Sequence, residues 1–182
     1  MPNSRYKPFC LMLVWISMKV KLKPKICYMA GLSTLPIERN AVGVETSFKE
    51  IEEQFIELAL NVFHIEPSKI VIEEKENKCL VYFYHSRIAR QLAEIRDRED
   101  RIFRVPSELS RSYVAGIFDS RGRRSAGGIT IRALSPKDDV MLANLGIHTR
   151  NGSIMNISAL LSFIEEYSLL LRHYPRIWQA WK

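Results

Sequence analysis

The chain has 182 residues, of which 47% are hydrophobic and 26% are charged. This length and composition can bury a core, as one domain or as two small halves, and exclude a disordered tail. The net charge of +7 favours an anionic partner, with nucleic acid first and an acidic membrane surface second. The three cysteines lie far apart without CxxC spacing, so neither a disulfide framework nor a zinc knuckle is indicated.

The first 23 residues are interpreted as an N-terminal arm or extension. Their apolar run, "FCLMLVWISM" at 9–18, is shorter than the roughly 20 apolar residues that span a bilayer. No small-residue cleavage site follows it, as a secretory signal would require. We therefore expect an intracellular, cytoplasmic protein that has no membrane partner.

The next elements in the chain are a helix within 24–36, a strand at 41–47 and a second helix. Ser47 and Glu50 predict a capping box at the start of that second helix. Its apolar residues recur at helical spacing and predict one buried face: Ile51, Phe55, Leu58, Ala59 and Val62.

A break at Pro67 separates this helix from a predicted hairpin at 69–85, which turns at Glu76 and Asn77. A short helix at 87–95 completes a first unit, for which we predict the bounds 24–105. The order of this unit is helix, strand, helix, hairpin, helix.

A second unit, predicted over 106–182 with a C-terminal tail, repeats this order in compressed form. Its elements are a helix at 106–120, a strand at 127–135, a helix at 136–146, a hairpin at 147–157 around Asn151 and Gly152, and a helix at 159–171. Two units of one pattern about 85 residues apart indicate an internal duplication.

Both units place Ala-Gly inside an apolar helix. The pairs are Ala30 with Gly31, in "YMAGLSTLP", and Ala115 with Gly116, in "YVAGIFDSRG". Glycine inside a helix costs about 1 kcal/mol relative to alanine, so another interaction should offset it. Close approach of the two helices would do so, and we expect them to form a central seam between the halves.

These two motifs resemble the LAGLIDADG homing endonucleases. "VAGIFDSRG" matches the nine-residue motif at Ala115, Gly116, Asp119 and Gly122, whereas "MAGLSTLP" keeps Met29, Ala30, Gly31 and Leu32. The resemblance implies an α+β fold of two pseudo-symmetric repeats, with helices packed on antiparallel sheets and the motif helices at the seam. It also implies that each motif helix delivers an acid at its eighth position, and that these acids hold divalent cations for phosphodiester cleavage.

The chain departs from the family at both of these positions. When the motif is counted from Ala-Gly, the eighth position is Arg121 in the second half and Pro36 in the first. Neither residue holds a metal ion, whereas a cation just past a helix C-terminus is favourable by roughly 0.3–1 kcal/mol. The remaining acid, Asp119, stands at the sixth position and is interpreted as a capping or seam residue. We therefore expect no catalytic residue, no metal site and no cofactor.

The strands after each motif helix are short, with room for one strand and at most a stub. What remains for binding is charge: 121–182 holds nine basic residues and four acids, whereas 45–76 holds nine acids and three lysines. The candidate phosphate contacts are Arg39, Lys49, Arg121, Arg123, Arg124 and Arg132.

The leading hypothesis is a monomeric nucleic-acid-binding protein of homing-endonuclease ancestry that does not cleave its target. DNA is favoured over RNA as that target. One alternative is an active or residually active endonuclease, which alone would require Mg²⁺. Another is a protein-interaction module on the same fold. In the C-terminal "RHYPRIWQAWK", docking of the tryptophans on the core is favoured over stacking on bases.

Overall fold

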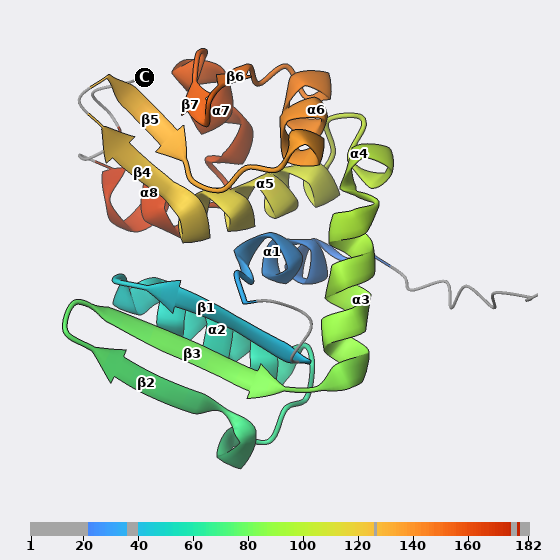
Figure 1. Cartoon of the computed structure of the whole chain (residues 1–182), viewed down its shortest axis with the longest axis vertical. Helices are drawn as coiled ribbons and strands as arrows, with labels where there is room; N and C mark the ends of the chain where they lie inside the picture. Colours follow the sequence, from blue (N-terminus) through green and yellow to red (C-terminus); the bar gives the residue numbers. More distant parts are fainter. Residues whose placement is uncertain (1–21, 36–39, 126, 176–177, 179–182) are drawn as a thin grey trace, which may run out of the picture.

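The computed structural model describes residues 22–35, 40–125, 127–175 and 178 (Figure 1). The expected N-terminal arm therefore lies almost entirely outside the described residues, and so do Pro36, Arg39 and Trp181. None of the helices in the described part of the chain is long and apolar enough to cross a membrane.

The first half forms a three-stranded antiparallel sheet with the order β1-β3-β2. Its elements are α1 (Pro24–Leu32), β1 (Ala41–Thr46), α2 (Lys49–Asn61), a 3-10 turn η2 (Pro67–Lys69), β2 (Val71–Lys75), β3 (Lys78–Tyr84) and α3 (Ser86–Asp97). The helix α2 covers one face of this sheet, where the rings of Phe55 and Phe83 lie 5.9 Å apart (Figure 1). The predicted hairpin at Glu76 and Asn77 is confirmed, because Lys75 pairs with Lys78 across it.

The second half forms a four-stranded antiparallel sheet with the order β4-β5-β7-β6. After the connecting helix α4 (Glu99–Ile102), its elements are α5 (Glu108–Arg121), β4 (Gly122–Ser125), β5 (Gly128–Ile131), α6 (Pro136–Asn144), β6 (Thr149–Arg150), β7 (Ser153–Ile154), α7 (Ile157–Ile164) and α8 (Leu169–His173). The turn at Asn151 and Gly152 is also confirmed, since both residues have positive φ angles, 51° and 77°. The α+β fold expected from the sequence is therefore the fold observed.

The helices α1 and α5 pack against each other between the two sheets and form the seam (Figure 1). Their glycines meet the opposite backbone in the same way. A Cβ atom on Gly31 would lie 2.2 Å from the carbonyl oxygen of Tyr113, and one on Gly116 would lie 2.2 Å from the carbonyl oxygen of Tyr28. Only glycine permits this approach, which explains why both helices accept its cost.

The capping box predicted at Ser47 and Glu50 is wrong. The helix α2 starts at Lys49 with Phe48 as its N-cap residue, and Ser47 makes no capping hydrogen bond. Thr46 competes for this turn, because its hydroxyl accepts from the backbone N–H of Phe48 at 3.1 Å. The carboxylate of Glu50, in turn, accepts from the hydroxyl of Tyr174.

The single helix expected at 159–171 is divided into α7 and α8. The break falls before Ser168, whose hydroxyl accepts from the backbone N–H of Leu171 and so begins α8 anew. Downstream, Trp178 is 5% exposed and packs edge-on against Phe118, with ring centroids 5.0 Å apart. The docking expected for the tryptophans is thus observed for Trp178.

The strand stub expected after α5 is a full strand. β4 pairs with β5 over four residues, from Gly122 opposite Ile131 to Ser125 opposite Gly128. The strand expected over 127–135 correspondingly ends at Ile131. The second half therefore presents a short hairpin directly at the end of its motif helix.

Candidate nucleic-acid interface

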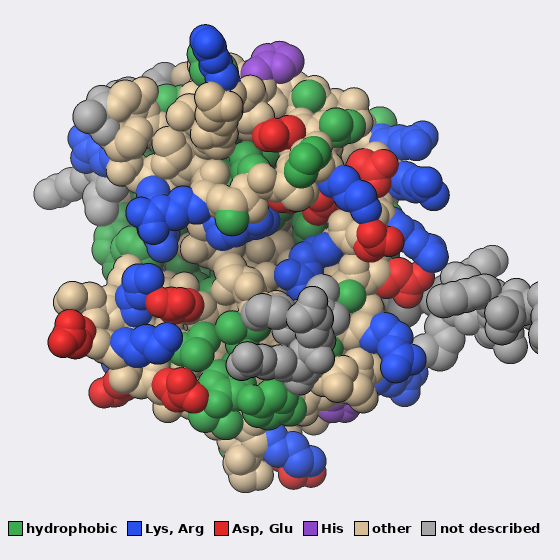
Figure 2. Space-filling model, viewed as in Figure 1, with side chains coloured by type: hydrophobic (Ala, Val, Ile, Leu, Met, Phe, Trp, Pro, Cys, Tyr) green, Lys and Arg blue, Asp and Glu red, His purple; other side chains and the backbone are tan. Residues whose placement is uncertain are grey.

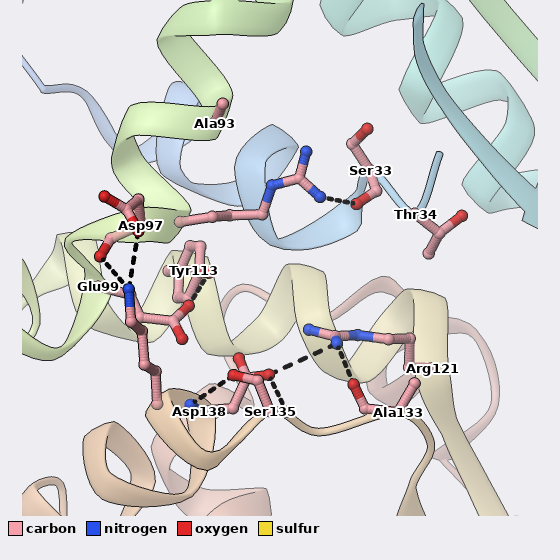
Figure 3. A pocket seen from close by; sticks show the side chains of 12 residues that line it. Ser33, Thr34, Ala93, Asp97, Glu99, Tyr113, Arg121, Ala133, Ser135 and Asp138 are labelled. Carbon is pink, nitrogen blue, oxygen red and sulfur yellow. Dashed lines mark hydrogen bonds and ion pairs between the residues drawn. The ribbon is translucent and has the colours of Figure 1, made fainter. Parts of the chain in front are cut away.

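A cavity of about 640 Å³ opens where α1 and α5 end. It is lined by Ser33 and Thr34 after α1, by Arg121 at the end of α5, and by side chains from α3, α4 and α6 (Figure 3). The C-terminal ends of two helices concentrate carbonyl oxygens, whose partial negative charge attracts cations. The seam thus creates a site for positive charge at this cavity.

Arg121 supplies a cation at the end of α5. Its Nη1 atom donates to the carbonyl oxygen of Ala133 at 3.0 Å and lies 3.7 Å from Oδ2 of Asp138. The side chain is 20% exposed, and its buried Nε has no hydrogen-bond partner among the described residues. The guanidinium is therefore held in place beside the cavity that it lines.

Arg96 supplies a second cation at the end of α1. It reaches across from α3, and its Nη1 donates to the carbonyl oxygen of Ser33, the C-cap residue of α1, at 3.1 Å. Its Nε is likewise buried and unpaired within the described part of the chain. Burial, with Arg121 nearby as a further contribution, lowers the pKa of Arg96. Both motif helices therefore end at a guanidinium.

The acids of the cavity are engaged in hydrogen bonds of their own. Glu99 is 3% exposed and accepts from the hydroxyl of Tyr113, and burial raises the pKa of Glu99 to about 7. Asp138 accepts from the backbone N–H of Ser135, which begins α6. Asp97 lies 2.7 Å from the ammonium of Lys137, which also lines the cavity.

Asp119 does not line the cavity, although it is the remaining acid of the motif. Its carboxylate accepts from the hydroxyls of Tyr28 at 2.7 Å and Ser168 at 2.5 Å. It also accepts from the backbone N–H groups of Leu169 and Leu170, at the start of α8. Burial raises the pKa of Asp119, which is 1% exposed. The carboxylate fastens α8 to the seam helix α5.

Arg123 and Arg132 lie near each other at the β4–β5 hairpin. Arg123 stands opposite Thr130, so these two side chains share a face, and Arg132 follows directly after β5. Burial lowers the pKa of Arg123, and the positive charge of the nearby Arg132 lowers it further. Arg124 stands opposite Ile129, which is 1% exposed on the core side. Arg124 therefore shares the face of Ile129 and projects away from the face that carries Arg123.

The six predicted phosphate contacts thus do not form one set. Lys49 begins α2, on the side of the first sheet that α2 covers, where it is 81% exposed and lies 3.8 Å from Glu53. Arg39 lies outside the described residues. The residues brought to one side are Arg121, Arg123 and Arg132, and the structure adds Arg96 and Lys137.

The space-filling view shows this side of the molecule (Figure 2). Lysine and arginine side chains gather around a hollow in the middle of the face, between the two halves, and hydrophobic side chains gather over the first sheet. The basic residues missed in the sequence, Arg96 and Lys137, carried no usable signal. Each is one charge among several on an amphipathic helix, and only the packing of α3 and α6 around the seam brings them to the cavity.

The architecture, with two antiparallel sheets about a pair of Ala-Gly helices, is the fold of the LAGLIDADG homing endonucleases. The chain matches I-DmoI in complex with DNA and Mn over 70% of its own length and 80% of that chain, with a TM-score of 0.51 and 13% identity. It matches mesophilic variants of the homing endonuclease I-DmoI over 79% of its length and 96% of that chain, with a TM-score of 0.56 and 13% identity.

A further similar structure is full-length DUF199/WhiA from Thermatoga maritima, with a TM-score of 0.55 and 16% identity. This match covers 87% of the present chain and 61% of WhiA. No family model matches the chain, and no curated protein matches it. At these identities the likeness establishes the fold, and the resemblance noted in the sequence is confirmed at that level.

Proposed function

We propose that this protein binds nucleic acid, with DNA ahead of RNA, and that it descends from a homing endonuclease whose cleavage activity it has lost. The observation that carries the proposal is the pair of guanidiniums at the ends of α1 and α5. In the family resemblance these ends present acids toward the scissile phosphates. Here Arg96 and Arg121 present positive charge at the same ends. The solved neighbours that contain DNA support the choice of nucleic acid as the partner.

The residues at the helix ends do not fit the divalent cations of the family. A metal pair needs carboxylates that are free to ligate, yet Asp119 already accepts four hydrogen bonds at α8. Arg121 would repel a cation next to Asp138. No cluster of three or more His, Cys, Asp or Glu side chains that could hold a metal occurs among the described residues. The helix ends therefore offer no free carboxylates for a pair of catalytic cations.

The same arrangement suits the phosphates of a nucleic-acid backbone. Guanidinium groups bind phosphate oxygens through charge-assisted hydrogen bonds, and the side chains of Arg121 and Arg96 both line the cavity. Arg123 and Arg132 extend the positive charge along β4 and β5. Contacts of this kind fix the position of the strand and carry no sequence information by themselves.

We further propose that residues 24–105 and 106–182 are two repeats of one ancestral unit. The matching contacts of Gly31 and Gly116 support this, because each glycine meets the equivalent residue of the other helix. A chain that contains both repeats completes the seam within itself, so we propose that it binds as a monomer.

The test is fluorescence anisotropy of a labelled DNA duplex and a matched RNA hairpin over a series of salt concentrations. Binding should fall linearly in log–log form, and Arg132→Gln should reduce the slope by about one unit, as expected for one lost phosphate contact. Lys49→Gln removes the same charge on the α2 side of the sheet and should leave the slope unchanged. Equal effects of both substitutions would contradict the assigned face.

Cleavage is tested on the same DNA with Mg²⁺ or Mn²⁺ present. The proposal requires the duplex to stay intact under conditions where it is bound. A defined cut that persists in Arg121→Gln would show an active endonuclease whose acids lie elsewhere. Absence of nucleic-acid binding even at low salt would leave the protein-interaction module as the function of this fold.

A further inference from the structure

The first sheet carries two tyrosines on the face that α2 does not cover. Val81 and Phe83 are fully buried on the α2 side, so alternation along β3 turns Tyr82 and Tyr84 outward. Their rings stand edge to face at 85°, with centroids 5.4 Å apart, and Tyr84 is 59% exposed. Val71, opposite Tyr82 on β2, is 36% exposed and adds to this apolar surface, and contiguous exposed apolar surface can mark an interaction site.

The residues of β1 that stand opposite these rings are small, and the side chain of Leu35 packs over Gly43. On β1, Ala41 stands opposite Tyr84 and Gly43 stands opposite Tyr82. A Cβ atom on Gly43 would lie 2.5 Å from Cβ of Tyr82, so no larger residue fits there. The hydroxyl of Tyr82 donates to Glu73 at 2.7 Å, which fixes that ring in place and, as the first cause, raises the pKa of Tyr82 to about 12. The pair is thus a preformed platform, and the ring of Tyr84 is its open part.

Positive charge borders this platform on the side of the second half. Glu45, on the same face of β1, lies 2.9 Å from the ammonium of Lys78 and is also within electrostatic range of Arg123. Arg123 belongs to the basic face of β4 and β5 described above. The tyrosine face of the first sheet therefore lies near Arg123 by way of Glu45. Figure 2 shows hydrophobic side chains over the first sheet and lysine and arginine side chains between the two halves.

We infer that Tyr82 and Tyr84 stack on unpaired bases of a single-stranded nucleic acid whose phosphates continue to Arg123 and Arg132. Unpaired bases offer flat faces to aromatic side chains, whereas a duplex encloses its bases and offers phosphates. The inference rests on the proposed function and narrows its target to unpaired strands.

The experiment compares labelled strands of about 15 nucleotides, as RNA and as DNA, with the duplex of the same sequence. Single strands should bind more tightly than the duplex. Tyr84→Ala should weaken single-strand binding roughly tenfold without changing the salt slope, because stacking loses no phosphate contact. Tyr84→Phe keeps the ring and should bind as the wild type does. Since Tyr84 is mostly exposed, its substitution leaves the core intact, which circular dichroism verifies.

The outcomes separate this inference from the proposed function. If no strand and no duplex binds at low salt, the proposed function fails and the inference fails with it. If the duplex binds as tightly as the single strands, and Tyr84→Ala binds as the wild type does while Arg132→Gln is impaired, the inference alone is overturned. A preference between RNA and DNA among single strands that depend on Tyr84 supports the inference and identifies the strand.

Discussion

The seam allows a quantitative prediction for Gly116→Ala. The added Cβ would lie 2.2 Å from the carbonyl oxygen of Tyr28 and 2.8 Å from the backbone nitrogen of Leu32. Both neighbours are backbone atoms, so no side-chain rotation relieves the contact, and the two helices must separate by roughly 1 Å. Such a gap forfeits about a quarter to a half of each dispersion contact across the seam. Alanine gains about 1 kcal/mol in helix propensity over glycine, which offsets part of this cost. We therefore expect the free energy of unfolding to fall by a net amount of about 2–4 kcal/mol.

Urea unfolding followed by circular dichroism measures this loss. Gly31→Ala should cost the same amount, because its Cβ would meet Tyr113 and Ile117 at 2.2 and 2.9 Å. The double substitution should cost less than the sum, since the first already separates the helices. Gly127→Ala is the control, because its Cβ would have no neighbour within 4 Å. If Gly116→Ala unfolds within about 0.5 kcal/mol of Gly127→Ala, the close approach at the seam is refuted.

Two further predictions concern buried carboxyl groups. Asp119→Asn should destabilise the protein by about 2 kcal/mol or more, because an amide cannot accept all four hydrogen bonds. Hydrogen exchange should then accelerate at the backbone amides of Leu169 and Leu170, which donate to Asp119. Unchanged exchange at these amides would argue against the capping role of Asp119. Burial raises the pKa of Glu99 to about 7, so the folded state favours the protonated carboxyl. The contribution of this carboxyl to the free energy of unfolding is therefore complete below pH 4.5 and is lost as the pH rises through 7. Glu99→Gln should remove this dependence and be more stable than the wild type at pH 8 by about 2 kcal/mol, whereas parallel pH profiles of the two proteins would contradict it.

Local patterns predicted the elements that depend on neighbours in sequence. The turn at Asn151 and Gly152 needs two positive φ angles, which these residue types accept, and it formed where expected. The Ala-Gly pairs predicted the seam because a glycine cost inside a helix calls for a close contact. The spacing of Ser47 and Glu50 fits a capping box, but the prediction was wrong because the hydroxyl of Thr46 forms the turn before α2 instead.

Features that depend on distant residues were beyond the sequence pattern. The break before Ser168 depends on Asp119, 49 positions earlier, and a continuous apolar stripe does not reveal it. The second guanidinium at the seam, from Arg96, depends on how α3 packs beside α1. The opposite directions of Arg123 and Arg124 could have been predicted from the sequence, because neighbouring residues of a strand alternate between its faces.

The seam also determines the order in which the protein can fold during synthesis. Most of α1 is buried, including Cys27, Met29 and Leu32, and its principal contact is α5, about 85 residues later in the chain. At the usual elongation rates, the apolar surface of α1 leaves the ribosome roughly 4–17 s before its partner exists. During that interval the first half is an unfinished body with an exposed helix face. Slower translation would lengthen its exposure to aggregation and to chaperones.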